Sequence, residues 1–329
     1  MNVEFHYYIL SFLCHRAGFS GEQAAMIANS SQLVDASIIS RSISHAEGSY
    51  TTLATQNYGW WEEQAPWSVF LPFHFFPGDL DYGGAGRMDG RRNHWSCTPN
   101  STGVKELLKR ALKSRSLYRV GIGLHTFSDS WAHQNFSGKL EDWNAVDESS
   151  LIPNIGHAQL LTLPDETDAE WEDPRLNGEN RSIRNGERFM ESARKIYRYL
   201  CTYMGRSFDD ETFVMDELAE LLGFPGFPRG REERVLDLII AGDVERYDRK
   251  RWWQEAVFLD GGEDEELFGG YSKLLWLREA VRSYTAQGGS RREESLTARE
   301  NFLSSHLYRW NEAAREHLRE AHEILSYRG

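Results

Sequence analysis

The sequence predicts an all-α protein, a multi-helix bundle with long irregular loops. Three observations predict this class: apolar residues recur at three- and four-residue steps in seven segments, helix start and stop signals flank several of them, and stretches rich in Gly, Pro and Trp lie between them. The seven segments are residues 4–13, 24–39, 104–127, 188–204, 213–224, 232–242 and 301–327.

Signals at the ends of these segments support the helices. Ser20, with Gln23 three residues later, predicts a capping box before the second segment, and Ser101 or Thr102 precedes the third. Glycine ends helices readily, and glycines stand where three helices should stop, at Gly18, Gly205 and Gly242.

The chain is expected to fold as a single domain over residues 1–329. Residues 1–170 are expected to carry a metal site, and the helical residues 180–329 to pack against that half. Two stretches, residues 42–101 and about 137–181, break the helical pattern. Loops of this length in a compact domain usually serve a function, so the site is expected among them.

Composition narrows the classes of partner. A net charge of −13 disfavours nucleic acid and anionic membranes, so a small molecule or a lipid head group is the expected partner. Three cysteines without a CxxC pair argue against a disulfide framework. No apolar run approaches the ~20 residues of a membrane span. The N-terminus lacks signal-peptide features, so a cytoplasmic location is expected, although non-classical secretion would leave no trace in the sequence.

The stretch "LHTFSDSWAHQNF" (124–136) places His125, Asp129 and His133 four residues apart in an otherwise apolar helix. Residues four apart on a helix differ by about 40° in direction, so the three side chains lie along one face and can converge on a cavity. Two readings are open: a polar seam of mutual hydrogen bonds in the core, or a metal site.

Further histidines and acids favour metal. His74 and His157 sit in irregular sequence among apolar residues, and His6 lies in the apolar first helix. Asp35 lies late in the second helix among residues that look buried, and a buried carboxylate needs a cation or several donors. Imidazole and carboxylate ligands without cysteine suit zinc, with manganese or iron as substitutes. Ions bridged by a carboxylate activate water and support phosphoester hydrolysis.

These residues resemble the zinc-dependent phospholipase C superfamily, which also contains the fungal-type zinc single-strand nucleases. The resemblance is carried by "HTFSDSWAHQNF", His74, Asp35, His6 and the downstream "GHA", and it covers about residues 3–165. The opening, residues 4–35, looks like that of a poorly characterised bacterial branch. The resemblance implies an all-α fold with a trinuclear zinc cleft and a metal-dependent hydrolase.

The resemblance implies a role for each residue. One zinc would lie among Asp35, His74, His125 and Asp129, with Asp129 reaching a second ion. His133 and His157 would hold another ion with a downstream carboxylate, and His6 would help with the third. Asp129 or Asp35 would orient or deprotonate the attacking water.

The chain departs from the family pattern in three places. The helix reads H-x3-D-x3-H where the family has a longer second spacing, and Leu161 stands where the family has an acid. Asp165 or Glu166 could replace that acid, and Asp165 is preferred because "LPD" begins a turn. Secreted members use the N-terminal amine as a ligand, which is not expected here, so a dinuclear site is an alternative. His45 and His94 are candidate substitute ligands.

The predicted function is hydrolysis of a phospholipid-like or small phosphodiester. A choline-like head group would need an acid and aromatic faces, for which the candidates are Glu4, Tyr58, Trp60, Trp61 and Phe75, unless they form the loop's own core. A single-strand nuclease is the alternative, for which only "GRMDGRRNHW" (86–95) offers basic and aromatic residues together. A metal-binding protein or a non-phosphate metalloenzyme on the same scaffold is the third reading.

Overall fold

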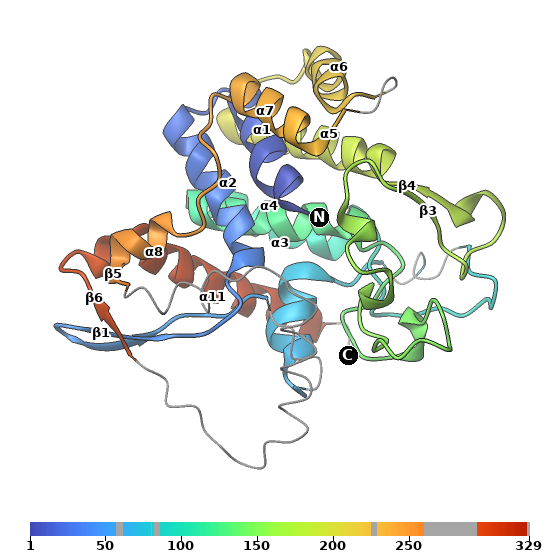
Figure 1. Ribbon diagram of the computed structural model, residues 1–329, viewed down its shortest axis with the longest axis horizontal. Coiled ribbons are helices and arrows are strands. Elements are labelled where there is room, and N and C mark those ends of the chain that lie inside the picture. The colour runs from blue at the N-terminus through green and yellow to red at the C-terminus, as the bar shows by residue number, and fades with distance from the viewer. Residues whose placement is uncertain (57–61, 80, 82–85, 225–228, 260–294, 328–329) are drawn as a thin grey trace.

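The structure, a computed structural model, describes residues 1–56, 62–79, 81, 86–224, 229–259 and 295–327, and it is mostly helical (Figure 1). The α-helices of the described residues are α1 (Leu10–Ala17), α2 (Gly21–Ala36), α3 (Thr102–Lys113), α4 (Leu117–Ala132), α5 (Asn185–Met204), α6 (Glu211–Leu222), α7 (Arg231–Gly242), α8 (Arg251–Ala256) and α11 (His306–Ser326). Two π-helical segments, η1 (Glu4–Ile9) and η2 (Pro66–His74), and short 3₁₀ turns, η3 (Asp142–Asn144), η4 (Ala158–Leu160), η5 (Leu163–Asp165), η6 (Gly178–Arg181) and η7 (Phe302–Ser304), complete the helical part.

The all-α prediction holds for the bulk of the protein but misses two small sheets. One has the strand order β2-β1-β6-β5, from β2 (Gly48–Thr51), β1 (Ser42–His45), β6 (Leu296–Ala298) and β5 (Val257–Phe258); the other pairs β3 (Glu170–Glu172) with β4 (Ser182–Arg184). β1 runs antiparallel to β2 and parallel to β6, with Ile43 opposite Leu296. Pairing over such sequence distances depends on tertiary context, so local periodicity could not reveal it.

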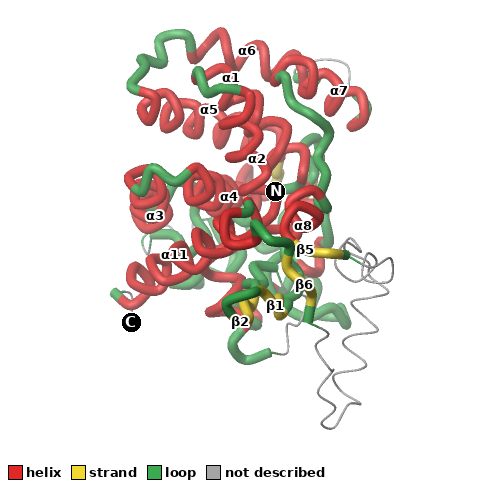
Figure 2. The backbone as a smooth tube through the Cα atoms, turned by 90° about the vertical axis from the view of Figure 1, so that its left-hand side faces the viewer, coloured by secondary structure: helices red, strands yellow, loops and turns green. Residues whose placement is uncertain are grey.

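Helix α4 is the centre of the molecule. It packs against α2, α3, α5, α11 and η2, and every residue from Tyr118 to Ala132 is buried. Figure 2 shows α4 lying between α1, α2 and α5 on one side and α3 and α11 on the other. The side chains that α4 presents therefore face protein on every side, so its polar residues need partners inside the fold.

Glycine allows α2 and α4 to approach closely. A Cβ placed on Gly121 would lie 2.3 Å from the carbonyl oxygen of Ile27 and 2.6 Å from the Cβ of Ser30. No larger residue fits there without moving α2. Because α2 carries Asp35 and α4 carries His125 and Asp129, this contact sets the distance between those side chains.

The predicted end signals are mostly confirmed. The Ser20 hydroxyl accepts from the Gln23 backbone, the Gln23 side chain accepts from the Ser20 backbone, and Ser101 caps α3. Gly18 and Gly205 cap α1 and α5 in the left-handed region, whereas Gly242 is the last residue of α7 and Asp243 is its left-handed cap.

Two predicted segment boundaries are wrong. The segment 104–127 is two helices, because Arg115 takes a left-handed backbone and Ser116 starts α4 as a cap, so the chain turns between α3 and α4. Helix α2 ends at Ala36 rather than near residue 39.

The core draws on both parts of the chain. The largest apolar cluster runs from Phe5 in η1 to Leu325 in α11, and a second cluster joins α2 and β1 to α8 and α11. The irregular stretches have their own smaller cluster around Phe70, Phe136 and Trp171. Within the described residues, no helix is both long and apolar enough to cross a bilayer.

Candidate metal centre

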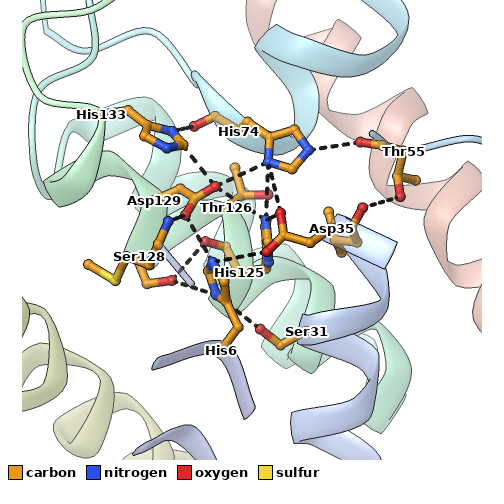
Figure 3. A network of polar contacts seen from close by, with 12 residues as sticks. His6, Ser31, Asp35, Thr55, His74, His125, Thr126, Ser128, Asp129 and His133 are labelled. Carbon is orange, nitrogen blue, oxygen red and sulfur yellow. Dashed lines mark hydrogen bonds and ion pairs between the residues drawn. The ribbon is translucent and has the colours of Figure 1, made fainter. Parts of the chain in front are cut away.

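The eight predicted ligands come together at one place, beside the C-terminal half of α4. Figure 3 shows six of them: His6, Asp35, His74, His125, Asp129 and His133. They form three groups whose candidate ligand atoms lie within 4.8 Å of one another: His6, His125 and Asp129; Asp35, His74 and His125; and His133, His157 and Asp165. These groups could each hold a metal ion. Because His125 belongs to two groups and Asp129 also contacts the third, the groups form one continuous cluster.

Four side chains have the spacing of a tetrahedral site. His74 Nδ1 and His125 Nε2 lie 3.3 Å apart, and each lies 3.2 Å from Asp129 Oδ2 and 3.8 Å from Asp35 Oδ1. Zinc–nitrogen bonds of about 2.0–2.1 Å in a tetrahedron place neighbouring ligand atoms about 3.3 Å apart. The residues present therefore fit one zinc-sized ion.

The two carboxylates of this set also face a second position. Asp129 Oδ1 lies 3.1 Å from His6 Nε2, and Asp35 Oδ2 lies 3.8 Å from the same nitrogen. Each carboxylate thus turns one oxygen to His74 and His125 and the other toward His6. This is the arrangement of bridging ligands between two ions.

The third group lies on the other side of Asp129. His133 Nε2 is 3.3 Å from Asp165 Oδ1, and His157 Nε2 is 3.4 Å from Asp165 Oδ2. Phe75 stacks on the His133 ring at 4.3 Å and lies tilted against His157. Of the two acids considered as the carboxylate partner of His133 and His157, Asp165 is the one that lies beside both rings. Glu166 instead contacts Asn2 and Arg231.

Backbone carbonyls fix how three of the histidines are protonated. His74 Nε2 donates to Thr55 O at 2.8 Å, His133 Nδ1 to His74 O at 2.7 Å, and His157 Nδ1 to Leu161 O at 2.9 Å, because a carbonyl can only accept. In each neutral ring the other nitrogen then has a lone pair facing a carboxylate oxygen. Two acceptors at 3.2–3.4 Å repel unless a proton or a metal ion lies between them.

Unpartnered atoms lead to the same conclusion. His6 Nε2 and His125 Nδ1 are buried, and neither has a hydrogen-bond partner. The His6 and His125 rings stack at 3.9 Å. His6 Nδ1 lies 3.5 Å from the hydroxyls of Ser31 and Ser128, whereas its Nε2 faces the acceptor oxygen Oδ1 of Asp129. A buried ring nitrogen without a partner costs free energy, which a bound cation near His6 would offset.

Burial keeps most of the imidazoles neutral. It lowers the pKa of His6, His125 and His157 to about 4, although nearby carboxylates oppose the shift. For His74 burial also lowers the pKa, but Asp129 and Asp35 outweigh it and the pKa is raised. Neutral imidazole is the form that binds metal, so at pH 7 three of these rings are ready to do so.

The carboxylates differ in their surroundings. Burial raises the pKa of Asp35, whereas for Asp129 the positive groups around it outweigh burial and hold the pKa well below its usual value. Asp35 is 24% exposed and Asp129 only 1%. Asp35, His157 and Asp165 are the members of the cluster that are partly exposed to solvent.

The amino group of Met1, which is not expected as a metal ligand, lies inside the cluster. It is 2.5 Å from Asp129 Oδ1 and 3.2 Å from Asp165 Oδ1. Burial lowers the pKa of this amine, but Asp129 and Asp165 outweigh it and raise the value to about 11. A positive charge thus lies between Asp129, in the group of His6 and His125, and Asp165, in the group of His133 and His157.

The helix geometry explains the unusual H-x3-D-x3-H spacing. Helix α4 ends at Ala132, and His133 is its C-cap, with φ −90° and ψ 13°. The predicted convergence of the three side chains is confirmed: the His133 backbone still donates to Asp129 O, and His133 Nδ1 lies 3.7 Å from Asp129 Oδ2. Its Nε2 faces Asp165, and its ring lies against His157, whereas His125 and Asp129 face His74.

Several candidates of the sequence lie outside the cluster. His45 lies in β1 against Phe302, and His94 is exposed; neither belongs to the three groups. Glu4, proposed as an acid for a cationic head group, is fully buried and bound to Arg234 and Thr167, so it cannot meet a substrate. Tyr58, Trp60 and Trp61 lie outside the described residues.

The nuclease alternative depends on the basic residues of segment 86–95, and one of them is engaged in contacts within the protein. Arg87 is ion-paired with Asp89 and stacked over Trp143, and it is nearly buried. This arginine is not free to hold a phosphate backbone. Of the cluster, Arg91 and Arg92 remain exposed.

Sequence reasoning missed the supporting contacts. Thr55 O, His74 O and Leu161 O are backbone atoms, which no residue type announces, and the Met1 amine is likewise invisible to side-chain patterns. The sequence does offer Gly156, the residue before His157, as a signal of a constrained backbone. In the structure its φ is +49°, and a Cβ there would lie 2.4 Å from the Phe75 ring.

Comparison with known proteins gives one match. The profile of DUF6765, described as a family of unknown function, matches residues 1–325, so the chain belongs to that family. No curated protein and no solved structure matches the chain.

Proposed function

We propose that this DUF6765 protein is a metal-dependent phosphoesterase that hydrolyses a phospholipid-like or other small phosphodiester with a metal-activated water. The observation that carries the proposal is that Asp129 and Asp35 each turn one oxygen toward His74 and His125 and the other toward His6. Carboxylates shared between neighbouring ion positions are typical of hydrolases that use two or more metals.

The donor set supports zinc. Five imidazoles and three carboxylates make up the cluster, and its first four ligand atoms have the separations of a tetrahedron. Manganese or iron could take the same ligands. Two ions account for His74, His125, His133 and His157 with their acids, and a third position follows from His6 and Asp129.

When bound, such ions lower the pKa of water and neutralise charge that develops on a phosphoryl group. The residues divide the remaining work. Asp129 is enclosed and holds its neighbours in place, whereas Asp35 is partly exposed to solvent. We therefore assign to a carboxylate oxygen of Asp35, rather than of Asp129, the acceptance of the proton from the attacking water.

The resemblance to the zinc-dependent phospholipase C superfamily supports the same reaction. The positions of the residues agree with what the resemblance implies: Asp35, His74, His125 and Asp129 lie together, His6 lies beside Asp129, and His133 lies near His157. Asp165, the substitute for the acid that this chain lacks at Leu161, lies beside the last two. The substrate is proposed to be small because the acidic chain and the engaged Arg87 leave little to hold a nucleic acid.

An activity screen on protein of known metal content tests the proposal. The full chain carries its affinity tag at the C-terminus, so that the Met1 amine is unaltered, and bound metal is counted by mass spectrometry. Apo protein and zinc-reloaded protein are then assayed on bis-p-nitrophenyl phosphate, phosphatidylcholine and single-stranded DNA.

We expect at least two equivalents of metal and zinc-dependent hydrolysis of one of the first two substrates. Turnover of single-stranded DNA alone would replace the proposal with the nuclease. Bound metal without turnover of any substrate would favour a metal-binding protein or non-phosphate chemistry, and absence of metal would refute the metal centre.

A further inference from the structure

A buried arginine from the C-terminal half of the chain joins two segments of the metal centre. Arg234 lies in α7 and is almost fully buried. Its Nε and one terminal nitrogen donate to the two oxygens of Glu4, at 2.7 and 3.1 Å. Its other terminal nitrogen donates to Asp168 at 2.9 Å and to the carbonyl of Arg229 at 2.7 Å. All three guanidinium nitrogens are thus engaged, which fixes the group in one orientation.

The acid at the centre of this contact is bound from two sides. Glu4 is fully buried, and besides Arg234 it accepts the hydroxyl of Thr167 at 2.6 Å. A buried carboxylate with this many partners has no freedom to serve a ligand. Its role must lie in what it connects.

The two connected segments each carry a candidate ligand. Glu4 lies in η1 two residues before His6, whose nitrogen faces Asp129. Thr167 and Asp168 follow Asp165, which faces His133 and His157. Arg234 therefore holds together two stretches of chain that are far apart in sequence and that supply different ion positions.

We propose that Arg234 is a positioning residue of the metal centre: by binding Glu4 and Asp168, it sets the distance between His6 and Asp165. This inference rests on the proposed metal centre. It assigns to α7 a function in a site to which that helix contributes no ligand. The group of Asp35, His74, His125 and Asp129 lies on α2, η2 and α4, so it does not depend on Arg234.

The test removes the contact without leaving a buried charge alone. The double variant E4M/R234M replaces both partners with apolar side chains of similar length. Proteins commonly tolerate such a replacement of a buried ion pair. The single variant D168N removes one partner of Arg234 at a half-exposed position and serves if the double variant does not fold. R234K keeps the charge but cannot bind Glu4 with two nitrogens.

A similar arginine pair elsewhere provides the control. Arg16 binds both oxygens of Glu217, at 2.8 and 2.5 Å, and also joins an N-terminal helix, α1, to the C-terminal half, in α6. It contacts none of the segments that carry candidate ligands. R16M/E217M therefore reports what loss of an inter-helix arginine pair does to the fold alone.

The readouts are circular dichroism, zinc equivalents after dialysis and zinc affinity by chelator competition. We expect folded E4M/R234M to lose at least one equivalent, or to bind its weakest ion at least about 10-fold less tightly, as loss of a contact that orients a ligand typically does. R234K and D168N should show smaller losses, and R16M/E217M should bind zinc like the wild type.

Wild-type zinc binding in folded E4M/R234M and in D168N would overturn the inference and leave the metal centre standing. Equal loss of zinc in R16M/E217M would also overturn it, because the effect would then belong to the fold. A wild-type chain without metal would overturn the metal centre and this inference together.

Discussion

Asp129 Oδ1 lies 3.1 Å from His6 Nε2, although 122 residues separate the two in sequence. The other oxygen of Asp129 lies 3.2 Å from His125 Nε2, so this carboxylate stands between two groups of candidate ligands. Of the two carboxylates that face both positions, Asp129 is the enclosed one, since Asp35 is partly exposed.

The first prediction concerns this carboxylate. D129N keeps the size of the side chain but puts a weakly coordinating amide in place of the negative charge. Zinc affinity, measured by chelator competition, should fall more than about 100-fold, beyond the loss seen when an outer contact to a ligand is removed. Hydrolysis should fall with it.

The matched control is D173N. Asp173 is as deeply buried as Asp129 and is paired with Arg175, but it belongs to none of the three groups. D173N should lower stability and leave zinc binding unchanged. Equal zinc affinity in D129N and the wild type would refute the bridging role.

The second prediction concerns removal of metal. Bound ligand stabilises a fold by about 2.7 kcal/mol at a free concentration 100 times its Kd. An unfolding entropy of about 2.1 cal/mol/K per residue means that a chain of 329 residues shifts its Tm by roughly 1.5 °C per kcal/mol. Chelation should therefore lower the Tm by about 4 °C per ion at such a concentration, measured by scanning calorimetry. Added zinc should restore it.

D129N provides the control for this measurement, because its Tm should respond weakly to zinc. A wild-type Tm that is the same with zinc and with chelator would contradict a structural contribution of the metal.

Whether a residue of the site can be predicted from the sequence depends on the kind of contact that it makes. His74, His125, Asp129 and Asp35 could be predicted because polar side chains in apolar surroundings need partners wherever they lie. Their grouping depends on α2, η2 and α4 meeting, and the spacing of residues within one segment says nothing about that. The expected grouping came from the resemblance to the zinc-dependent phospholipase C superfamily.

The fold shows the same division. Helices such as α2 and α5 follow from local periodicity and caps, whereas β6 pairs with β1 across about 250 residues. Periodicity located α11 correctly, but it could not show that His317 is buried, because a histidine on a charged helix looks like a surface residue.

The third prediction concerns His317. Its Nδ1 lies 2.7 Å from Arg119, which can only donate, so Nε2 bears the proton and donates to Pro72 O at 3.0 Å. Burial, and then Arg119, lower the pKa of His317 well below its usual value. The folded state therefore holds this ring neutral, while the unfolded chain takes up a proton below its pKa of about 6.5.

The sign of the pH effect follows from this difference. Protons bind the unfolded state more, so His317 costs stability as the pH falls below about 6.5, by up to about 1.4 kcal/mol per pH unit. H317Q keeps an acceptor and a donor but does not titrate. With chelator present, its free energy of unfolding should fall less between pH 7 and pH 5 than that of the wild type. Parallel curves would contradict a neutral buried His317.

The last prediction concerns the contact between α2 and α4. In G121A the added Cβ would lie 2.3 Å from Ile27 O, so α2 must move away from α4. Alanine favours a helix over glycine by about 1 kcal/mol, whereas overpacking costs about 1–3 kcal/mol, so the net change should be destabilising. The movement carries Asp35 away from His125, and zinc should bind less tightly although no ligand has changed. G21A is the control, because a Cβ on Gly21 at the start of α2 meets nothing within 4 Å. Urea unfolding and chelator competition on both variants measure the two effects, and a G121A protein that binds zinc like G21A would show that the helix spacing does not set the geometry of the site.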